Sequence, residues 1–247
     1  MSTVFIVLAH RDPPQVARLA ARLAPHQVLL HIDARVAAPL LHQFQVLLAP
    51  MANVRFLSRQ RSGWASWGLV AAALEGLRVA CAAPGWSHVM LLSGQDYPLL
   101  DVAEIDAFLG QYAGQAFLPH WFLPSPLWGA DGGMARVRYW HLPVLGRRVF
   151  VPLARRLPDG LVPVGGSMYW CLHRAAAHEV LKFIEQRPEA VAFFRHVWIP
   201  DELFVPTVVM NSPSRDDVIN EALTYIRWSQ PGSAHPDTLT VDRKTHV

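Results

Sequence analysis

The sequence predicts an α/β fold in which helices cover both faces of a mostly parallel central sheet. Two observations support this prediction. In the first half of the chain, short apolar runs rich in β-branched residues alternate with longer segments typical of helices. The chain is also 247 residues long and 52% hydrophobic, which suffices to bury one sizeable core. We therefore expect a single domain spanning 1–247.

Four strand and helix pairs are expected in the first half. The strands are 4–10, 28–33, 53–57 and 88–94, and the helices that follow them are 14–24, 37–49, 67–83 and 101–113. In such sheets ligands bind beyond the carboxyl ends of the strands, so the polar residues at those ends should meet in one crevice. These residues are His10, Arg11, Asp12, His31, Asp33, Arg35, Arg59, Arg61, Ser93, Gln95 and Asp96.

The second half of the chain is less regular. Residues 117–166 carry many Pro and Trp and show no clear period, which predicts a long excursion folded over the sheet edge. Regular structure should resume at 165–174, with a helix to Gln186, the segment 199–212 and a last strand at 224–228. No internal repeat or linker-like stretch indicates a second domain.

Composition and missing motifs exclude several classes of protein. A formal charge of +3 over this length is too weak to indicate nucleic-acid binding. The basic residues are nearly all Arg, whose planar guanidinium suits carboxylate or phosphate oxygens. Two distant cysteines exclude a disulfide framework and a Cys-rich metal site. The motifs of serine hydrolases, P-loop NTPases, zincins and dinucleotide oxidoreductases are absent.

No segment of the sequence predicts membrane insertion. The apolar run 4–9 has no basic lead and no small-residue cleavage site, so we expect a first strand and not a signal peptide. No other apolar run reaches the roughly 18 to 20 residues of a membrane span. We expect a cytoplasmic protein. Its nine Trp leave a peripheral membrane contact open, although carbohydrate stacking or core packing explains them equally well.

The strongest catalytic candidate is the triplet Pro200-Asp201-Glu202. An Asp that caps a helix, followed by Glu in the first turn, sets a carboxylate against the positive helix end, which favours its ionised form. Such a carboxylate can act as a general base. The alternative is an ordinary capped helix start.

Three further motifs carry polar residues at strand ends. In 92–99 a buried strand ends in Gly and Pro98 stops an immediate helix, so Asp96 should face the crevice or cap a turn. His31 and Asp33 share one strand face and could bind a metal, but a satisfied strand-end pair explains them equally. In Trp-Ala-Ser-Trp-Gly at 64–68, Ser66 is the expected helix N-cap.

Seven segments in order resemble the core-2/I-branching β-1,6-N-acetylglucosaminyltransferase family, which also includes the peptide O-xylosyltransferases. They are 5–23, LLHIDAR at 29–35, 53–78, HVMLLSGQDYPL at 88–99, GSMYWCLHR at 166–174, IPDELFVPTVVMNS at 199–212 and 225–239. The resemblance implies a GT-A-like fold with a Rossmann-like half, a UDP-sugar donor, inversion at the anomeric carbon and no divalent metal. The chain contains no Asp-x-Asp motif, in agreement with the last point.

The resemblance also implies roles for individual residues. Glu202 matches the catalytic base, with Asp201 beside it, Asp33 the position that contacts uridine, and Asp96 the floor of the active site. Without a metal, cationic side chains must neutralise the departing diphosphate, and Arg227 is a candidate by location. The full expected donor-binding set is His10, Asp33, Arg61, Ser66, Trp67, Ser93, Gln95, Asp96, Arg227, Arg243 and Lys244.

The acceptor side is the least matched part of the chain. Its expected residues are Trp121, Asp131, Arg136, Arg138, Trp140, Ser167 and Trp170, because aromatic faces pack on sugar rings. The halves are then 1–115 for the nucleotide-sugar and 116–247 for acceptor and catalysis. We expect transfer of a sugar, N-acetylglucosamine ahead of xylose, to a hydroxyl of a saccharide or peptide. The alternatives are a UDP-xylose-dependent xylosyltransferase and an inactive nucleotide-sugar or glycan-binding module.

Overall fold

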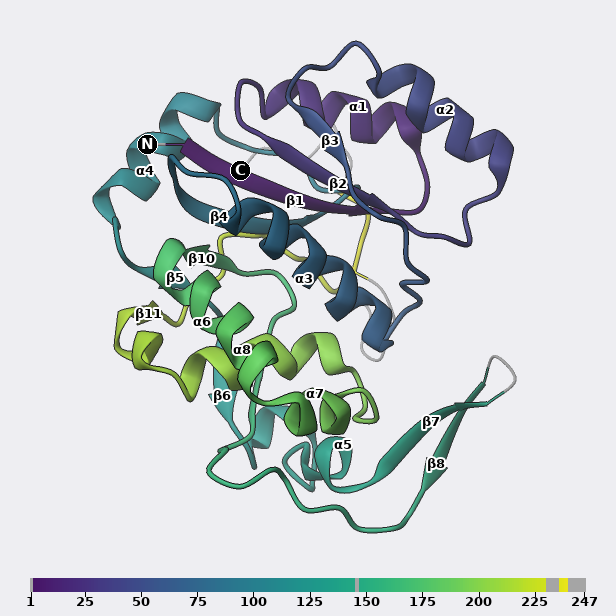
Figure 1. Cartoon of the computed structure of the whole chain (residues 1–247), viewed down its shortest axis with the longest axis vertical. Coiled ribbons are helices and arrows are strands. Elements are labelled where there is room, and N and C mark those ends of the chain that lie inside the picture. Colours follow the sequence, from purple (N-terminus) through teal and green to yellow (C-terminus); the bar gives the residue numbers. More distant parts are fainter. Residues whose placement is uncertain (1, 145–146, 230–235, 240–247) are drawn as a thin grey trace.

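A computed structural model of the protein describes residues 2–144, 147–229 and 236–239. Its centre is a seven-stranded sheet of order β11-β5-β10-β4-β1-β2-β3 (Figure 1). The strands are β1 (Ser2–Ala9), β2 (Val28–Ile32), β3 (Val54–Phe56), β4 (Trp86–Ser93), β5 (Ala116–Phe117), β10 (Cys171–His173) and β11 (Val218–Ile219). Strands β1 to β4 are parallel and β10 runs antiparallel to both of its neighbours. The predicted mostly parallel sheet is confirmed.

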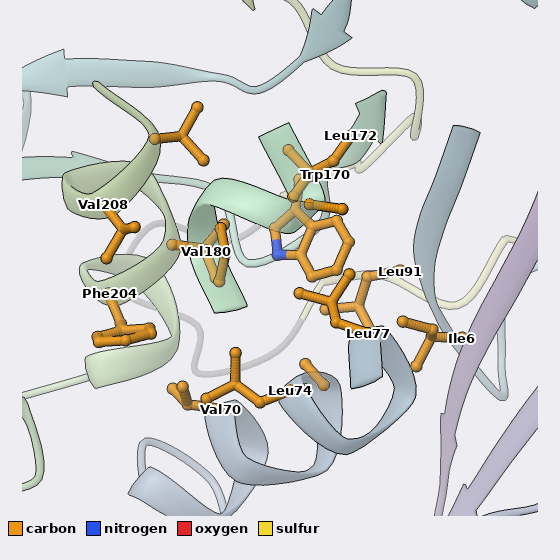
Figure 2. Packing of buried hydrophobic residues seen from close by; sticks show 14 of the residues in the cluster. Ile6, Val70, Leu74, Leu77, Leu91, Trp170, Leu172, Val180, Phe204 and Val208 are labelled. Atoms are coloured by element: carbon orange, nitrogen blue, oxygen red, sulfur yellow. The ribbon is translucent and has the colours of Figure 1, made fainter. Parts of the chain in front are cut away.

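Helices cover both faces of this sheet because the strands are apolar on both sides. On one face, Phe5 and Val7 of β1 pack against α1 (Pro13–Arg22) and α2 (Ala38–Leu48). On the other face, Ile6 and its neighbours pack against α3 (Trp67–Cys81), α6 (Arg174–Gln186) and α8 (Phe204–Met210) (Figures 1 and 2). Successive side chains of β1 thus enter opposite cores, as the pleat requires.

The four helices expected in the first half form at the expected places. The third is α3, and the fourth is α4 (Val102–Gln111), which packs Leu109 near β5 and β10. Asp12 caps α1 by accepting a hydrogen bond from the Gln15 N–H at 3.1 Å. Only His10 and Arg11 separate Asp12 from the end of β1, so α1 begins at the carboxyl edge of the sheet.

The region 117–166 contains more regular structure than its sequence indicates. It holds β6 (His120–Phe122), the 3₁₀ turn η1 (Pro126–Trp128), α5 (Met134–Arg138), β7 (Trp140–Val144), β8 (Arg147–Val151) and β9 (Val164–Gly166). Strand β6 pairs with β9, and β7 with β8 in a hairpin that projects from the body (Figure 1). These elements are three to five residues long, too short for a hydrophobic period to emerge.

The second half also corrects one predicted strand. After α6 come α7 (Pro188–Phe194), the 3₁₀ turn η2 (Pro200–Glu202), α8 and the 3₁₀ turn η3 (Pro213–Asp217), and then β11. The strand predicted at 224–228 is wrong, because residues 221–229 adopt no strand. Tyr225 and Trp228 are exposed there, so this apolar run has no buried sheet face to complete.

Candidate functional site

The carboxyl ends of the parallel strands meet at one edge of the sheet, as predicted. The Asp33 N–H donates to the Ala9 carbonyl at 3.0 Å, and the Gly94 N–H donates to the Leu8 carbonyl at 2.8 Å. The Arg11 guanidinium donates to the Gln95 side chain across the same edge. A Cβ at Gly94 would lie 2.9 Å from the Cβ of Ala9, so this close approach of two chain segments requires glycine.

Asp33 is held in a closed network at this edge. Its carboxylate accepts hydrogen bonds from the Arg35 guanidinium, at 2.6 Å for the shortest, and from the Ser62 hydroxyl at 3.1 Å. Burial alone would raise the pKa of Asp33, but the hydrogen bonds from Arg35 and Ser62 outweigh it and hold this pKa below its usual value. The Asp33 side chain is only 3% exposed, whereas that of Arg35 is 54% exposed. Arg35 therefore presents the accessible charge of this pair.

His31 lies on the same strand but serves the fold. Its Nε2 accepts a hydrogen bond from the Gln60 N–H at 3.0 Å, and burial lowers its pKa, so the ring is a neutral acceptor. Arg59 donates to the backbone carbonyls of Asp33 and Val36. The pair is only partly satisfied, because His31 Nδ1 is buried without a hydrogen-bond partner in the part of the chain that the structure describes. The described residues contain no cluster of three or more His, Cys, Asp or Glu placed to hold a metal ion.

The start of α3 packs against the loop that follows β3. Ser66 is the N-cap residue as predicted, but its hydroxyl donates to the Gly63 carbonyl at 2.6 Å and does not cap the helix. A Cβ at Gly68 would lie 1.8 Å from the Arg61 carbonyl oxygen, so the loop can cross the helix only over glycine. Trp67 packs edge-on against Phe204 at 5.1 Å, which ties α3 to the second half of the chain.

The end of β4 lies at the same edge of the sheet. The Asp96 carboxylate accepts a hydrogen bond from the Ser93 N–H at 2.7 Å, and burial raises its pKa. Tyr169 lies over this turn, in hydrogen-bonding contact with the Ser93 side chain. Burial and the charges of Asp96 and Asp201 raise the pKa of Tyr169 to about 12, so its hydroxyl stays protonated. Tyr169 thus joins the β4 turn to the segment with Asp201.

Glu202 lies in η2 beside an arginine that is distant in sequence. The Arg136 guanidinium donates to its carboxylate at 3.0 Å, and the two side chains are 24% (Arg136) and 37% (Glu202) exposed. Burial raises the pKa of Glu202, whereas the charge and hydrogen bond of Arg136 act to lower it. The carboxylate is therefore accessible from solvent and has a cationic partner.

One sequence prediction about this segment is wrong. Asp201 does not cap a helix, because η2 is a single 3₁₀ turn whose N-cap residue is Ile199, and α8 begins only at Phe204. Arg136, and not a helix end, is what favours the ionised form of Glu202. Ile199 adopts φ 55°, a left-handed conformation that is rare for a β-branched residue. Such strain, of about 1 to 2 kcal/mol, often marks functional segments.

The predicted acceptor residues have different environments. Some are exposed, some are buried in the core, and some only hold the nearby backbone in place. Trp170 is 2% exposed and packs among Leu77, Leu91 and Val180 (Figure 2), so its predicted contact with an acceptor is wrong. Asp131 accepts hydrogen bonds from the N–H groups of Gly133 and Ala135 and shapes the start of α5.

Of the other predicted acceptor residues, Arg136 and Arg138 lie in α5 and Trp140 follows it. Trp121 packs edge-on against Trp128 at 5.2 Å, and the Arg136 guanidinium lies 3.9 Å above the Trp128 ring. Arg138 is exposed, and Trp140 stacks with Arg155 at 4.2 Å. The Ser167 hydroxyl accepts from the Tyr169 N–H at 3.0 Å, so Ser167 orients the turn that carries Tyr169.

The predicted cations for a diphosphate are only partly within the described chain. Arg227 donates to the Asp237 carboxylate at 2.9 Å, and Arg243 and Lys244 lie outside the described residues. His10 and Arg61 are exposed at the carboxyl edge of the sheet. No helix within 2–144, 147–229 and 236–239 is long and apolar enough to cross a bilayer.

Sequence reasoning missed residues whose importance depends on contacts across the fold. Tyr169 is one of them, and its position two residues after Ser167 was the available signal. Arg35 was expected at the carboxyl edge of the sheet but not among the donor-binding residues. Trp198 gave no signal, because its role depends on its contact with Trp64, at 5.8 Å between ring centroids.

Comparison with known proteins identifies the family. A model of the core-2/I-branching enzyme family matches residues 3–246. The chain belongs to this family. Xylosyltransferase 1 of Pan troglodytes is 26% identical over 238 residues, and the match covers 92% of this chain and 24% of the relative. Xylosyltransferase 2 of Canis lupus familiaris is 26% identical over 213 residues, 83% of this chain and 24% of the relative.

This core-2/I-branching family member thus spans about a quarter of the length of those relatives. Among solved structures it is similar to a Bacillus anthracis protein assigned as a glucose-1-phosphate thymidylyltransferase, with 10% identity, a TM-score of 0.41 and coverage of 88% of this chain and 85% of that one. It is also similar to a nucleoside-diphosphate-sugar pyrophosphorylase from Vibrio cholerae, with 9% identity, a TM-score of 0.38 and coverage of 87% and 89%. Likeness at this level carries no functional argument.

Proposed function

We propose that this protein is an inverting, metal-independent glycosyltransferase that moves a sugar from a UDP-sugar to a hydroxyl of a saccharide or peptide. Family membership and the xylosyltransferase relatives support transfer of a glycosyl group. The observation that carries the mechanism is the partly exposed Glu202 carboxylate beside Arg136. Glu202 follows Asp201, whose charge raises the pKa of Tyr169. Tyr169 in turn contacts Ser93, which lies at the end of β4.

In the proposed reaction Glu202 acts as the general base. Its carboxylate takes the proton of the acceptor hydroxyl while the hydroxyl oxygen bonds to the anomeric carbon. The bond from that carbon to the UDP oxygen breaks, and UDP leaves with the electron pair. A single displacement from the opposite face inverts the configuration, and no enzyme nucleophile is needed. A carboxyl with a raised pKa is a stronger base, and such a base contributes about 10² to 10⁴ in rate.

The leaving diphosphate needs positive charge if no metal binds. Arg35 holds one edge of its guanidinium to Asp33 and keeps half of its side chain exposed, so we add it to the proposed cations. Arg61 is exposed at the same edge of the sheet. Guanidinium groups suit phosphate oxygens because their N–H groups match two oxygens at once.

Two donors remain proposals. UDP-N-acetylglucosamine is the expectation from the sequence, and the names of the relatives favour UDP-xylose. A cytoplasmic location is likewise a proposal. The choice of donor depends on the walls around the substituents at C2 and C5 of the sugar, which only a bound donor will define.

The test is release of UDP from each donor, with methyl glycosides and serine peptides as acceptors, with and without EDTA. Glu202→Gln should lower turnover by about 100-fold or more while UDP still binds. Glu179→Gln is the matched control, because Glu179 is also a partly exposed Glu beside a cation, Lys182, and lies on α6. Unchanged turnover in Glu202→Gln would remove Glu202 from its role. UDP binding without turnover of any donor would indicate a binding module, and loss of activity in EDTA would contradict metal independence.

A further inference from the structure

A cavity of about 340 Å³ lies beside the proposed base. It is formed by α5, the β7–β8 hairpin and the segment before η2, and its lining residues are Ala135, Arg136, His141, Phe150 and Trp198. Only Arg136 of these belongs to the acceptor residues predicted from the sequence. Ligand pockets for small molecules begin at about this volume, which suits one sugar ring with its substituents.

Flat rings form the walls of this cavity. The His141 ring centroid lies 5.4 Å from that of Phe150 and 5.5 Å from that of Trp198. Phe150 is 50% exposed although it is a large apolar side chain. Aromatic faces with one polar handle are the surfaces on which the C–H faces of sugar rings pack. Arg136 can donate hydrogen bonds to ring hydroxyls on the same side.

The cavity shares one residue with the surroundings of the proposed base. Arg136 lines it and touches the Glu202 carboxylate at 3.0 Å. Trp198 packs edge-on against Trp64, which precedes α3 on the nucleotide side. An occupant of the cavity would therefore lie between the hairpin and the base, where the hydroxyl of an acceptor has to arrive.

The chain around the cavity carries more basic than acidic residues. Residues 131–159 contain six Arg and two Asp, and one of these arginines, Arg136, pairs with Glu202. Arg155 packs against Trp140 and Phe193 and supports the hairpin. Arg138 and Arg156 are exposed and lie close together in the backbone, because the Arg155 N–H donates to the Arg138 carbonyl at 2.7 Å. Such a surface favours an acceptor with negative charge.

We propose that this cavity is an acceptor subsite for a sugar ring that carries a carboxylate. The aromatic walls pack on the ring, Arg136 binds its hydroxyls, and the exposed arginines attract the carboxylate. The assignment as an acceptor subsite rests on the proposed function, whereas binding of the acidic sugar does not. An acidic peptide fits the charge, but the small ring-lined volume favours a saccharide.

The experiment measures binding of methyl β-glucuronide and methyl β-glucoside, which differ by one carboxylate, by calorimetry at low and high salt. The glucuronide should bind about tenfold more tightly at low salt, and the difference should shrink in high salt. Phe150→Ala should weaken both sugars by about tenfold. Phe122→Ala is the matched control, since Phe122 is 52% exposed on β6 and does not line the cavity. Arg138→Gln with Arg156→Gln should remove the preference for the glucuronide.

Several outcomes overturn the proposal. Equal affinity for the two sugars, or affinity that Phe150→Ala leaves unchanged, contradicts an acidic-sugar subsite in this cavity. A Glu- and Tyr-containing peptide that displaces the glucuronide and itself receives the donor sugar would replace the saccharide by a peptide. UDP release separates the two proposals. Turnover that depends on Glu202 without glucuronide binding refutes only the subsite, and glucuronide binding without turnover of any donor refutes only the glycosyltransferase.

Discussion

Replacing Arg136 by Met tests whether this arginine keeps the proposed base ionised. The substitution keeps a long side chain over Trp128 but removes the charge that lies 3.0 Å from the Glu202 carboxylate. Since burial already raises the pKa of Glu202 and Arg136 opposes that effect, the pKa of Glu202 should rise further. The protonated carboxyl cannot accept the acceptor's proton, so the acidic limb of the rate profile should move to higher pH.

The magnitude follows from the geometry of the pair. Two unit charges about 4 Å apart interact by about 4 kcal/mol at an effective dielectric constant of 20, and solvent screening reduces this for exposed pairs to about 1 kcal/mol or less. Glu202 and Arg136 are partly exposed, which places the pair between these limits, at about 1 to 2 kcal/mol. A change of 1.4 kcal/mol is tenfold in an equilibrium constant. Activity on the acidic limb should therefore fall by about tenfold.

The assay is kcat/KM for UDP release as a function of pH. Arg136→Lys should restore much of the position of the acidic limb, because it restores a positive charge. Arg78→Met is the control, since Arg78 pairs with Glu75 at 3.7 Å on the surface of α3 and should leave the profile unchanged. An acidic limb that stays in place in Arg136→Met, with only KM increased, would show that Arg136 binds the acceptor without setting the ionisation of Glu202.

Three further predictions concern stability. Gly68→Ala should destabilise the fold by about 3 kcal/mol or more in urea unfolding, because the new Cβ would collide with a carbonyl oxygen. Gly110→Ala in α4 is the control: it has open space around it and should stabilise the fold by about 0.5 to 1 kcal/mol. Equal effects of the two substitutions would contradict the packing of the loop on α3. Trp170→Ala should lower the free energy of unfolding by about 3 to 5 kcal/mol, because Trp170 is buried. Trp170→Phe should fold and leave the KM for the acceptor unchanged. An increased KM would show that Trp170 contacts the acceptor. Burial lowers the pKa of His88 and of His173. In the unfolded chain a histidine has a pKa of about 6.5, so below this pH the unfolded chain binds more protons than the folded protein. The free energy of unfolding should therefore fall as pH drops below about 6.5, and this loss should shrink in His88→Gln; a flat profile would refute buried neutral histidines.

Local patterns were sufficient for the nucleotide-side half of the fold. Strands β1 and β4 have eight residues each, and the helices after β1 to β4 have 10 to 15, which is long enough for their apolar patterns to show in the sequence. The convergence of Asp33, Ser93 and Asp96 followed from the rule that parallel strands share a carboxyl edge. Elements of the second half are too short for such periods, and the segment 224–228 shows that an apolar run without a sheet face to fill need not form a strand.

The sequence alone determined the fold class, the family resemblance and the candidacy of Glu202, because these depend on residues close together in the chain. Tertiary structure decided what surrounds that carboxylate. Arg136 is 66 residues away from Glu202, and no local spacing predicts that their side chains meet. The burial of Trp170 and the exposure of Phe150 were likewise decided by packing, because an aromatic residue serves core and binding surface equally well until its neighbours are known.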